Sequence, residues 1–300
     1  MIKKIIYIGS PSYLSVKYEQ LLIKNNDSGE VNSIPIEDMG YLELDSPQIT
    51  ITNICMQSLL AKNVALVSCN SSHIPEGIFL PLAGNSLQSK RMQAQVNCSL
   101  PTKKNLWKQL IQYKIKNQHK LLNRNGEHPE TLKKMIDKVK SGDADNMEAR
   151  ASQYYWKNLF PIAKFKRSRF GDYPNNLLNY GYMVLRAITA RAVVSSGLHP
   201  SVGLHHKNQY NPFCLADDVM EPFRPAVDQI VLKYYLNNPA CETLTKKEKA
   251  IMLYIPHCDI ETEKKTHPLM IAVQKMCSSI VDIFEDEKKE LPYPELCLTE

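Results

Sequence analysis

The apolar residues change their spacing once along this 300-residue chain, near Gly84-Asn85-Ser86, and the change divides it into two parts. Residues 1–85 contain short runs rich in Ile, Val and Thr, separated by clusters of turn-forming residues. Such runs are typical of β-strands. Beyond Pro101 the apolar residues recur at helical spacing. The sequence therefore predicts an α+β protein with a β-rich N-terminal part and a helical C-terminal part.

The first part, residues 1–85, is predicted to be a small β-sandwich-like domain with one inserted helix. The helix is expected at 54–62, where the apolar residues Ile54, Met56, Leu59 and Leu60 are assigned to one face. The expected strands are 5–8, 13–16, 20–23, 31–36, 48–52 and 64–68.

The second part is predicted to be a larger all-α domain at 101–300, joined through a polar linker at 86–100. The expected helices are 102–122, 129–140, 145–160, 175–196, 217–236, 245–254 and 268–284. The stretch after 284 combines an acidic run with prolines, and we expect it to be a solvated end. The lysines assigned to the polar face of the first helix are Lys103, Lys104, Lys108, Lys114, Lys116 and Lys120.

Composition bounds the class of protein only loosely. The formal net charge of +6 is compatible with nucleic-acid binding, although many soluble proteins are as basic. The eight cysteines include no CxxC pair, which favours reduced thiols in a cytoplasmic protein over disulfides or a zinc site. No run of about 18 apolar residues occurs, so we expect no membrane span.

The densest group of chemically competent side chains lies between Gly203 and Asp228. His205 and His206 are followed by a polar loop and then by three acids, Asp217, Asp218 and Glu221. A histidine with carboxylates nearby is a ligand set for a divalent metal that binds oxygen-rich substrates. Since Asp218 and Glu221 are three residues apart, they would share one face of a helix.

Each of these features also has a plain structural explanation. Paired histidines in a loop are often hydrogen-bonded, and acids at a helix start interact favourably with the helix dipole. Glu148 lies among small residues that let another helix approach, where a carboxylate needs a partner or a metal. It could instead be exposed, or pair with Arg150 or a lysine.

Three motifs together resemble the Cas1 family, the CRISPR-associated endonucleases that integrate spacers. They are Glu-Ala-x-Ala-Ser-x-x-Tyr-Trp from Glu148, Gly-Leu-His-His from Gly203, and Leu-Ala-Asp-Asp-Val-Met-Glu-Pro-Phe-Arg-Pro-x-Val-Asp from Leu215. Their order and separation match the family over essentially the whole chain. The paired histidines followed by Asn-x-Phe-x-Leu-Ala further resemble the integrases of type II systems. One departure is Asn146, where many relatives have glycine.

The resemblance implies a catalytic metal site made of Glu148, His206 and Glu221. The family pattern Gly-x-x-His selects His206 over His205, and Asp218 and His205 remain candidates to share or orient the site. The implied ion is Mg²⁺ or Mn²⁺. The implied reaction is spacer insertion into a CRISPR array, in which a prespacer 3′-hydroxyl attacks a phosphodiester. Two alternatives stay open: a structure-specific metal-dependent DNA nuclease without integration, and a non-catalytic DNA-binding scaffold.

The resemblance also implies partners. These are double-stranded DNA of the prespacer and the CRISPR repeat, a second copy of the chain bound through the β-rich domain, the companion protein Cas2, and in type II systems the effector nuclease. Contacts to DNA would come mainly from Lys and Arg. The candidates are Lys164, Lys166, Arg167, Arg169, Arg224, Lys90 and Arg91. For the cluster at 164–169 a solvated charged loop is an equally good explanation, and Arg224 could merely neutralise Asp218 or Glu221.

Overall fold

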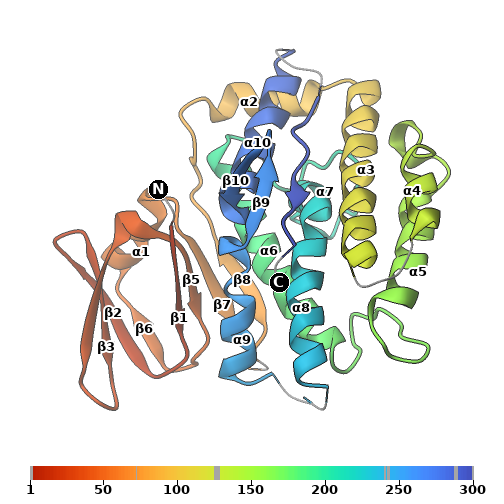
Figure 1. Cartoon of the computed structure of the whole chain (residues 1–300). Coiled ribbons are helices and arrows are strands. Elements are labelled where there is room, and N and C mark those ends of the chain that lie inside the picture. The colour runs from red at the N-terminus through yellow and green to blue at the C-terminus, as the bar shows by residue number, and fades with distance from the viewer. Residues whose placement is uncertain are drawn as a thin grey trace. The chain divides into compact units, whose positions relative to one another are not determined.

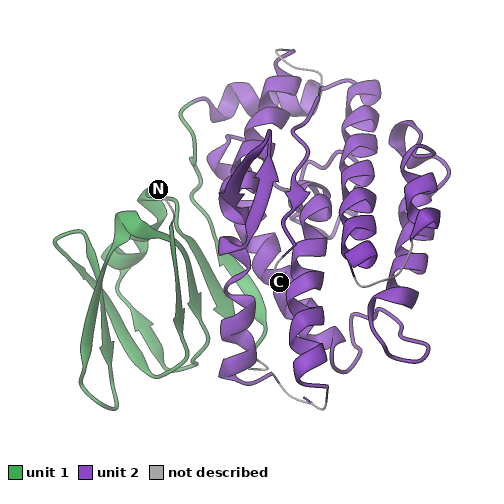
Figure 2. Cartoon of the chain, viewed as in Figure 1, with its two compact units in different colours: residues 1–86 green, residues 87–300 purple. Residues whose placement is uncertain are grey.

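The computed structural model describes residues 3–71, 73–124, 129–239, 241, 244–286 and 290–298. The chain forms two compact units, Met1–Ser86 and Leu87–Glu300 (Figure 2). The first is rich in strands and the second is mainly helical, so the predicted α+β class is confirmed.

Two four-stranded sheets build the first unit and face each other across its core (Figure 1). In one sheet β1, β5 and β7 are parallel and β8 is antiparallel to β7; in the other β2 pairs antiparallel with β3 and parallel with β6, and β4 pairs with β3. The bounds are β1 (Lys4–Ile8), β5 (Met39–Leu44), β7 (Ala65–Cys69), β8 (Pro75–Phe79), β4 (Val31–Pro35), β3 (Gln20–Asn25), β2 (Ser12–Lys17) and β6 (Ile49–Ile51).

Apolar residues from both sheets and from the inserted helix α1 (Asn53–Ala61) form the core of this unit. Leu14 and Leu21 come from one sheet, Leu42 and Leu66 from the other, and all four side chains are buried. Strands β5 and β8 were not predicted. Most of β5 is buried on both faces, so it lacks the alternation that marks a strand with one solvated face. β8 contains proline and glycine, which are uncommon in strands.

The second unit is built around α6 (Asn175–Ser195), which packs against four other helices: α7 (Cys214–Met220), α8 (Arg224–Asn237), α9 (Lys246–Met252) and α10 (Leu269–Phe284). Gly181 permits a close approach of α6 and α8, since a Cβ there would lie 2.6 Å from Val227 Cγ1. Among the described residues no helix is long and apolar enough to cross a membrane. The remaining helices are α2 (Gln88–Asn97), α3 (Leu100–Arg124), α4 (Glu130–Ile136), α5 (Met147–Leu159) and the 3₁₀ turns Ile36–Asp38, Ser141–Asp143, Glu221–Phe223 and Ile255–His257.

The segment interpreted as a linker, residues 86–100, is corrected by the structure, because α2 occupies most of it. Its polar composition is misleading. The buried side chain of Gln95 donates hydrogen bonds to the carbonyls of His199 and Val202 and accepts one from the N–H of His199. The amide of Gln95 thus bonds α2 to the backbone of residues 199–202 in the second unit.

The prediction of an all-helical second domain was wrong near the C-terminus. A three-stranded antiparallel sheet forms there, with β9 (Asp259–Thr262) between β10 (Lys265–Pro268) and β11 (Glu295–Leu296). Glu263 and Lys264 turn the hairpin with φ of 51° and 63°, the left-handed conformation that a tight two-residue hairpin requires. The predicted solvated end is wrong for its last part, because Leu291 and Leu296 are buried.

The helix predicted at 217–236 is divided into α7, the turn Glu221–Phe223 and α8. Pro222 and Pro225 each occupy the first turn of a new segment, where their missing N–H groups leave no bond unmade. This division places Glu221 at a junction between two helices instead of on the same continuous helix as Asp218.

Asn117 on α3 ties this junction to the C-terminal segment. Its Nδ2 donates to the carbonyls of Pro222 and Pro294 at 2.9 and 2.8 Å, and its Oδ1 accepts from Tyr293 Oη and the N–H of Leu296. All hydrogen-bonding positions of this buried amide are therefore used.

Replacing Asn117 with Leu should lower the free energy of unfolding by about 2–4 kcal/mol, because it leaves buried backbone groups without partners. Urea denaturation followed by circular dichroism would measure the change. Asn237→Leu is the matched control, since the amide of Asn237 is exposed and, among the described residues, donates to the carbonyl of Lys233 in its own helix. An equal effect of both substitutions would contradict the role given to Asn117.

Candidate metal centre

Glu148 stands in the first turn of α5, and a buried aspartate fixes that turn. The carboxylate of Asp143 accepts hydrogen bonds from the N–H groups of Met147 and Glu148 at 2.8 and 2.9 Å. Asn146, just before the helix, has φ of 52° and ψ of 46°. Glycine and asparagine both adopt this left-handed conformation readily, so asparagine preserves the entry to the helix.

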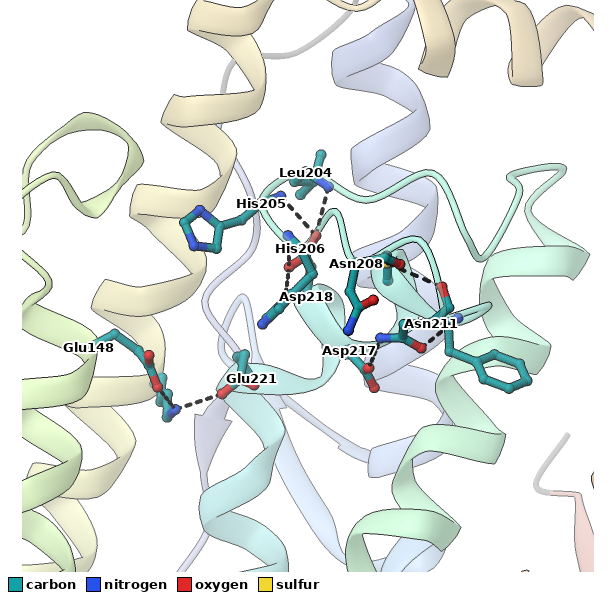
Figure 3. A network of polar contacts seen from close by, with 12 residues as sticks. Glu148, Leu204, His205, His206, Asn208, Asn211, Asp217, Asp218 and Glu221 are labelled. Atoms are coloured by element: carbon teal, nitrogen blue, oxygen red, sulfur yellow. Dashed lines mark hydrogen bonds and ion pairs between the residues drawn. The ribbon is translucent and has the colours of Figure 1, made fainter. Parts of the chain in front are cut away.

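His206 lies in a short loop that wraps around the carboxylate of Asp218 (Figure 3). Asp218 is fully buried in α7 and accepts from the N–H groups of Leu204, His205 and His206 at 2.6, 3.0 and 3.3 Å. The loop approaches so closely that a Cβ on Gly203 would lie 2.4 Å from the carbonyl oxygen of His206. The Gly-Leu-His-His motif thus encloses a carboxylate.

Asp218 also orients the imidazole of His206. Nδ1 lies 2.6 Å from Oδ1 of Asp218, and this bond raises the pKa of His206 although burial lowers it. Since an ionised carboxylate only accepts, Nδ1 carries the hydrogen in the neutral ring and Nε2 has the free lone pair. Figure 3 shows Nε2 directed away from Asp218 toward the side where Glu221 lies. The geometry favours Asp218 as the residue that orients the ligand and Glu221 as the second acidic ligand.

His205 has a different environment from its neighbour. Its ring stacks on Trp107 of α3, with ring centroids 4.3 Å apart and planes within 2°, and the residue is exposed. The edge of His206 meets the same indole at 5.6 Å. Trp107 therefore contacts both histidines, and of the two it is His206 that contacts the carboxylate of Asp218.

The two glutamates share a lysine. Nζ of Lys114, on α3, lies 2.5 Å from Oε1 of Glu148 and 2.7 Å from Oε2 of Glu221 (Figure 3). Oε1 of Glu221 accepts from Nε of Arg224 at 2.8 Å. Lys114 and Glu221 are both buried, whereas the side chain of Glu148 is 31% exposed. The pairing of Glu148 with a lysine was one of the structural explanations left open by the sequence.

Positive charge keeps the carboxylate of Glu221 ionised. Burial alone would raise the pKa of Glu221, but Arg224 and Lys114 lower it to about 2. Burial lowers the pKa of Lys114, and the charges of Glu221 and Glu148 reverse that effect and raise it. Glu221 and Lys114 therefore carry their charges at neutral pH.

The side chains present fit a divalent ion in their chemistry. Two carboxylates and an imidazole are oxygen and nitrogen donors that suit Mn²⁺ readily and Mg²⁺ adequately. The buried Oε2 of Glu221 has an ionic neighbour in Lys114 but no hydrogen bond of good geometry, so it has an acceptor position to offer. Within the described parts of the chain, no three His, Cys, Asp or Glu side chains already converge closely enough to hold an ion.

The basic residues proposed to contact DNA separate into two groups. Lys164, Lys166 and Arg169 are exposed between α5 and α6. Arg167 instead donates to Asn175 and Asn179. Its guanidinium also lies near the aromatic rings of Trp156 and Tyr182.

The remaining candidates are engaged within the second unit. Lys90 pairs with Glu285 at 2.8 Å, and Arg91 donates to the carbonyl of Ser196 at 3.1 Å. Arg224 contacts Glu221 and lies 4.6 Å from the ring centre of Tyr182. These contacts favour structural roles for the three residues.

Sequence reasoning missed Lys114 and Trp107. It assigned Lys114 to the polar face of its helix, but the residue follows the buried Leu110 and Ile111 by four and three positions, which indicates the buried face. That pattern was readable from the sequence. Asp143 gave no comparable signal, because its role depends on the turn that precedes α5.

Comparison with known proteins gives matches over most of the chain. The family model described as CRISPR associated protein Cas1 matches residues 6–254. One curated relative is the CRISPR-associated endonuclease Cas1 of Neisseria meningitidis serogroup C (strain 8013). It is 34% identical over 286 residues, which cover 94% of this chain and 93% of the relative.

Solved structures share the fold. A casposase bound to integration product superposes with a TM-score of 0.81 at 18% identity, covering 100% of this chain and 96% of the other. A chain from a Cas6-RT-Cas1–Cas2 complex superposes with a TM-score of 0.75 at 17% identity, covering 99% of this chain and 36% of the other.

Replacing Asp218 with Asn should release the histidine loop. The NH₂ group of asparagine cannot accept the hydrogen bonds that one oxygen of the carboxylate accepts from this loop. We expect the pKa of His206, followed by NMR titration, to fall toward its ordinary value of about 6.5. In the parent, the raised pKa of His206 adds to the free energy of unfolding. This contribution is fully present below the unfolded-state pKa of about 6.5 and is lost as pH rises through the pKa of the folded state. The variant should lack this pH dependence.

Asp217→Asn is the matched control for this experiment. Asp217 neighbours Asp218 in α7 but pairs with Arg186 and accepts from Asn211. Its replacement should leave the pKa of His206 much less changed. An unchanged pKa in Asp218→Asn would exclude the orienting role.

Proposed function

Because the chain belongs to the Cas1 family of CRISPR-associated proteins, we propose that it is a metal-dependent DNA integrase that inserts spacers into a CRISPR array. The observation that carries the proposal is the placement of Glu148 and Glu221 on opposite sides of one buried nitrogen, with the free edge of His206 directed toward Glu221. The casposase of similar fold is bound to an integration product, which supports this chemistry.

Glu148, Glu221 and His206 would hold the ion, and each is held by a second residue. Asp218 keeps the hydrogen of His206 on Nδ1, so that Nε2 is available to bind. Arg224 fixes Glu221 through Oε1 and leaves Oε2 to face the site. A bound Mg²⁺ or Mn²⁺ would lower the pKa of the attacking 3′-hydroxyl and stabilise charge on the phosphate. The new phosphodiester forms as the old one breaks, and the departing 3′-oxygen takes up a proton.

The proposed partners follow from the family. They are double-stranded DNA, a second copy of the chain bound through the strand-rich unit, the companion protein Cas2, and a type II effector nuclease. A chain of similar fold comes from a Cas6-RT-Cas1–Cas2 complex, which supports the pairing with Cas2. The exposed Lys164, Lys166 and Arg169 support a contact to DNA phosphates.

A metal-dependent nuclease without integration is the second candidate. The same ligands can activate water in place of a 3′-hydroxyl, so the site geometry is equally compatible with hydrolysis. The products distinguish the two functions, because integration joins two DNA strands and hydrolysis only cuts one. A non-catalytic scaffold would give neither product.

We expect His206→Ala and Glu221→Gln each to reduce metal-dependent strand transfer by more than roughly 100-fold. Loss of a residue that only orients a ligand costs up to about that much, and loss of a ligand should cost more. The assay would combine a supercoiled CRISPR-array plasmid, a short duplex with free 3′-hydroxyls, Cas2 and Mn²⁺ or Mg²⁺. His205→Ala is the matched control and should retain most activity, because its ring packs on Trp107.

Joining that survives in His206→Ala but not in His205→Ala would reverse the assignment of the two histidines. Cleavage without joining would favour the nuclease, and no reaction in either metal would favour the scaffold.

The exposed Lys164, Lys166 and Arg169, between α5 and α6, should contribute to DNA affinity whatever the base sequence of the DNA. Arg169→Ala should weaken binding and reduce the slope of log K against log salt by about 1. Arg167→Ala should instead lower thermal stability, because its guanidinium bonds to Asn175 and Asn179. Fluorescence anisotropy over a salt series would test the slope, and an unchanged slope in Arg169→Ala would remove this residue from the interface.

A further inference from the structure

Lys114 occupies an unusual position for a lysine. It lies on the buried face of α3 with its side chain 8% exposed, and its amino group is in contact with a carboxylate of α5 and another at the α7–α8 junction. Both carboxylates, Glu148 and Glu221, are proposed metal ligands. The ammonium group of Lys114 is a compact cation between two carboxylates, so it occupies the kind of position that a metal ion would take.

Charge balance argues that this lysine and a divalent ion do not share the two carboxylates. Lys114 and Arg224 already supply two positive charges to Glu148 and Glu221. An ion would add two more beside the buried Lys114 and Glu221, where like charges at short distance repel more strongly than in water. One of the resident cations must therefore move away when an ion binds.

Of the two cations, Lys114 is the one that can move away more easily. Of the two glutamates, Arg224 contacts Glu221, through Oε1, and its guanidinium is supported by the ring of Tyr182 at 4.6 Å. Lys114 instead contacts the one oxygen of Glu221 that has no hydrogen bond of good geometry. The four-carbon stem of a lysine also rotates easily, whereas the planar group of arginine is held by its stacking partner.

We propose that Lys114 is an internal competitor for the metal site: its amino group holds Glu148 and Glu221 together, and it must withdraw from them before a divalent ion binds. The lysine keeps two like charges in place without metal, and it weakens metal binding by the energy needed to displace it. This inference rests on the proposed function, because it assumes that the two glutamates are metal ligands.

The test compares Mn²⁺ binding by the full chain and by Lys114→Met, with free Mn²⁺ counted by electron paramagnetic resonance. Methionine retains most of the length of the side chain without its charge. We expect the variant to bind Mn²⁺ at least about tenfold more tightly, since it has no cation to displace. In chelator it should melt at a lower temperature than the parent, and added Mn²⁺ should raise its melting temperature by more.

Lys120→Met is the matched control on the same helix. Lys120 pairs with Glu295 and is partly exposed, so its loss should leave Mn²⁺ affinity unchanged. Lys114→Arg covers the case in which Lys114→Met does not fold. The arginine keeps the charge and forms bidentate bonds to carboxylates, so it should be displaced less easily and Mn²⁺ should bind more weakly than to the parent.

Weaker or unchanged Mn²⁺ binding by folded Lys114→Met would overturn the inference, because the lysine would then support the site or play no part in it. Tighter binding by Lys114→Arg would do the same. If neither the parent nor Lys114→Met binds Mn²⁺, the result would count against the proposed metal site as a whole, and not only against displacement of Lys114 by the ion.

Discussion

The second unit depends on how two neighbouring carboxylates, one of them buried, are paired with positive charge. Unpaired charges in such a position are costly, and removing one partner from a buried ion pair is strongly destabilising. The chain meets this requirement with Lys114 from α3 and Arg224 from α8, so the site joins helices that are distant in sequence. The position of α3 relative to α5 and α8 is thus set partly by charge and not only by apolar packing.

The second constraint is the arrangement around Asp218. A single carboxylate accepts three backbone N–H groups and one imidazole N–H, so the shape of the loop and the tautomer of His206 are fixed together. Such a carboxylate has little capacity left to bind a metal. The proposed division of roles between Asp218 and Glu221 therefore rests on the number of hydrogen bonds that each carboxylate already accepts. Spacing along a presumed continuous helix could not separate the two residues.

The sequence predicted the fold class and most elements because their apolar periods are regular, as in β2, β3 and α6. It failed where tertiary contacts override local composition. α2 is polar yet anchored through Gln95, and β5 is buried without alternation. The motifs brought Glu148, His206 and Glu221 to attention, but Lys114 belongs to no motif. Lys114 acquires its role only in the folded chain, where α3, α5 and the α7–α8 junction meet. The apolar spacing along α3 therefore predicts that Lys114 is buried but not which residues it contacts.

The motif from Leu215 to Asp228 contains five charged side chains, and the structure gives them different tasks. Asp217 pairs with Arg186, Asp218 orients His206, and Arg224 neutralises Glu221. Asp228, whose pKa burial raises to about 6, accepts from Tyr182, the ring that supports Arg224. Of the five, Glu221 is the proposed ligand, and Asp218 and Arg224 hold it or the neighbouring histidine. Because the proposed metal site would serve water and a 3′-hydroxyl equally well, the choice between cutting and joining would come from surfaces that hold DNA, outside this motif.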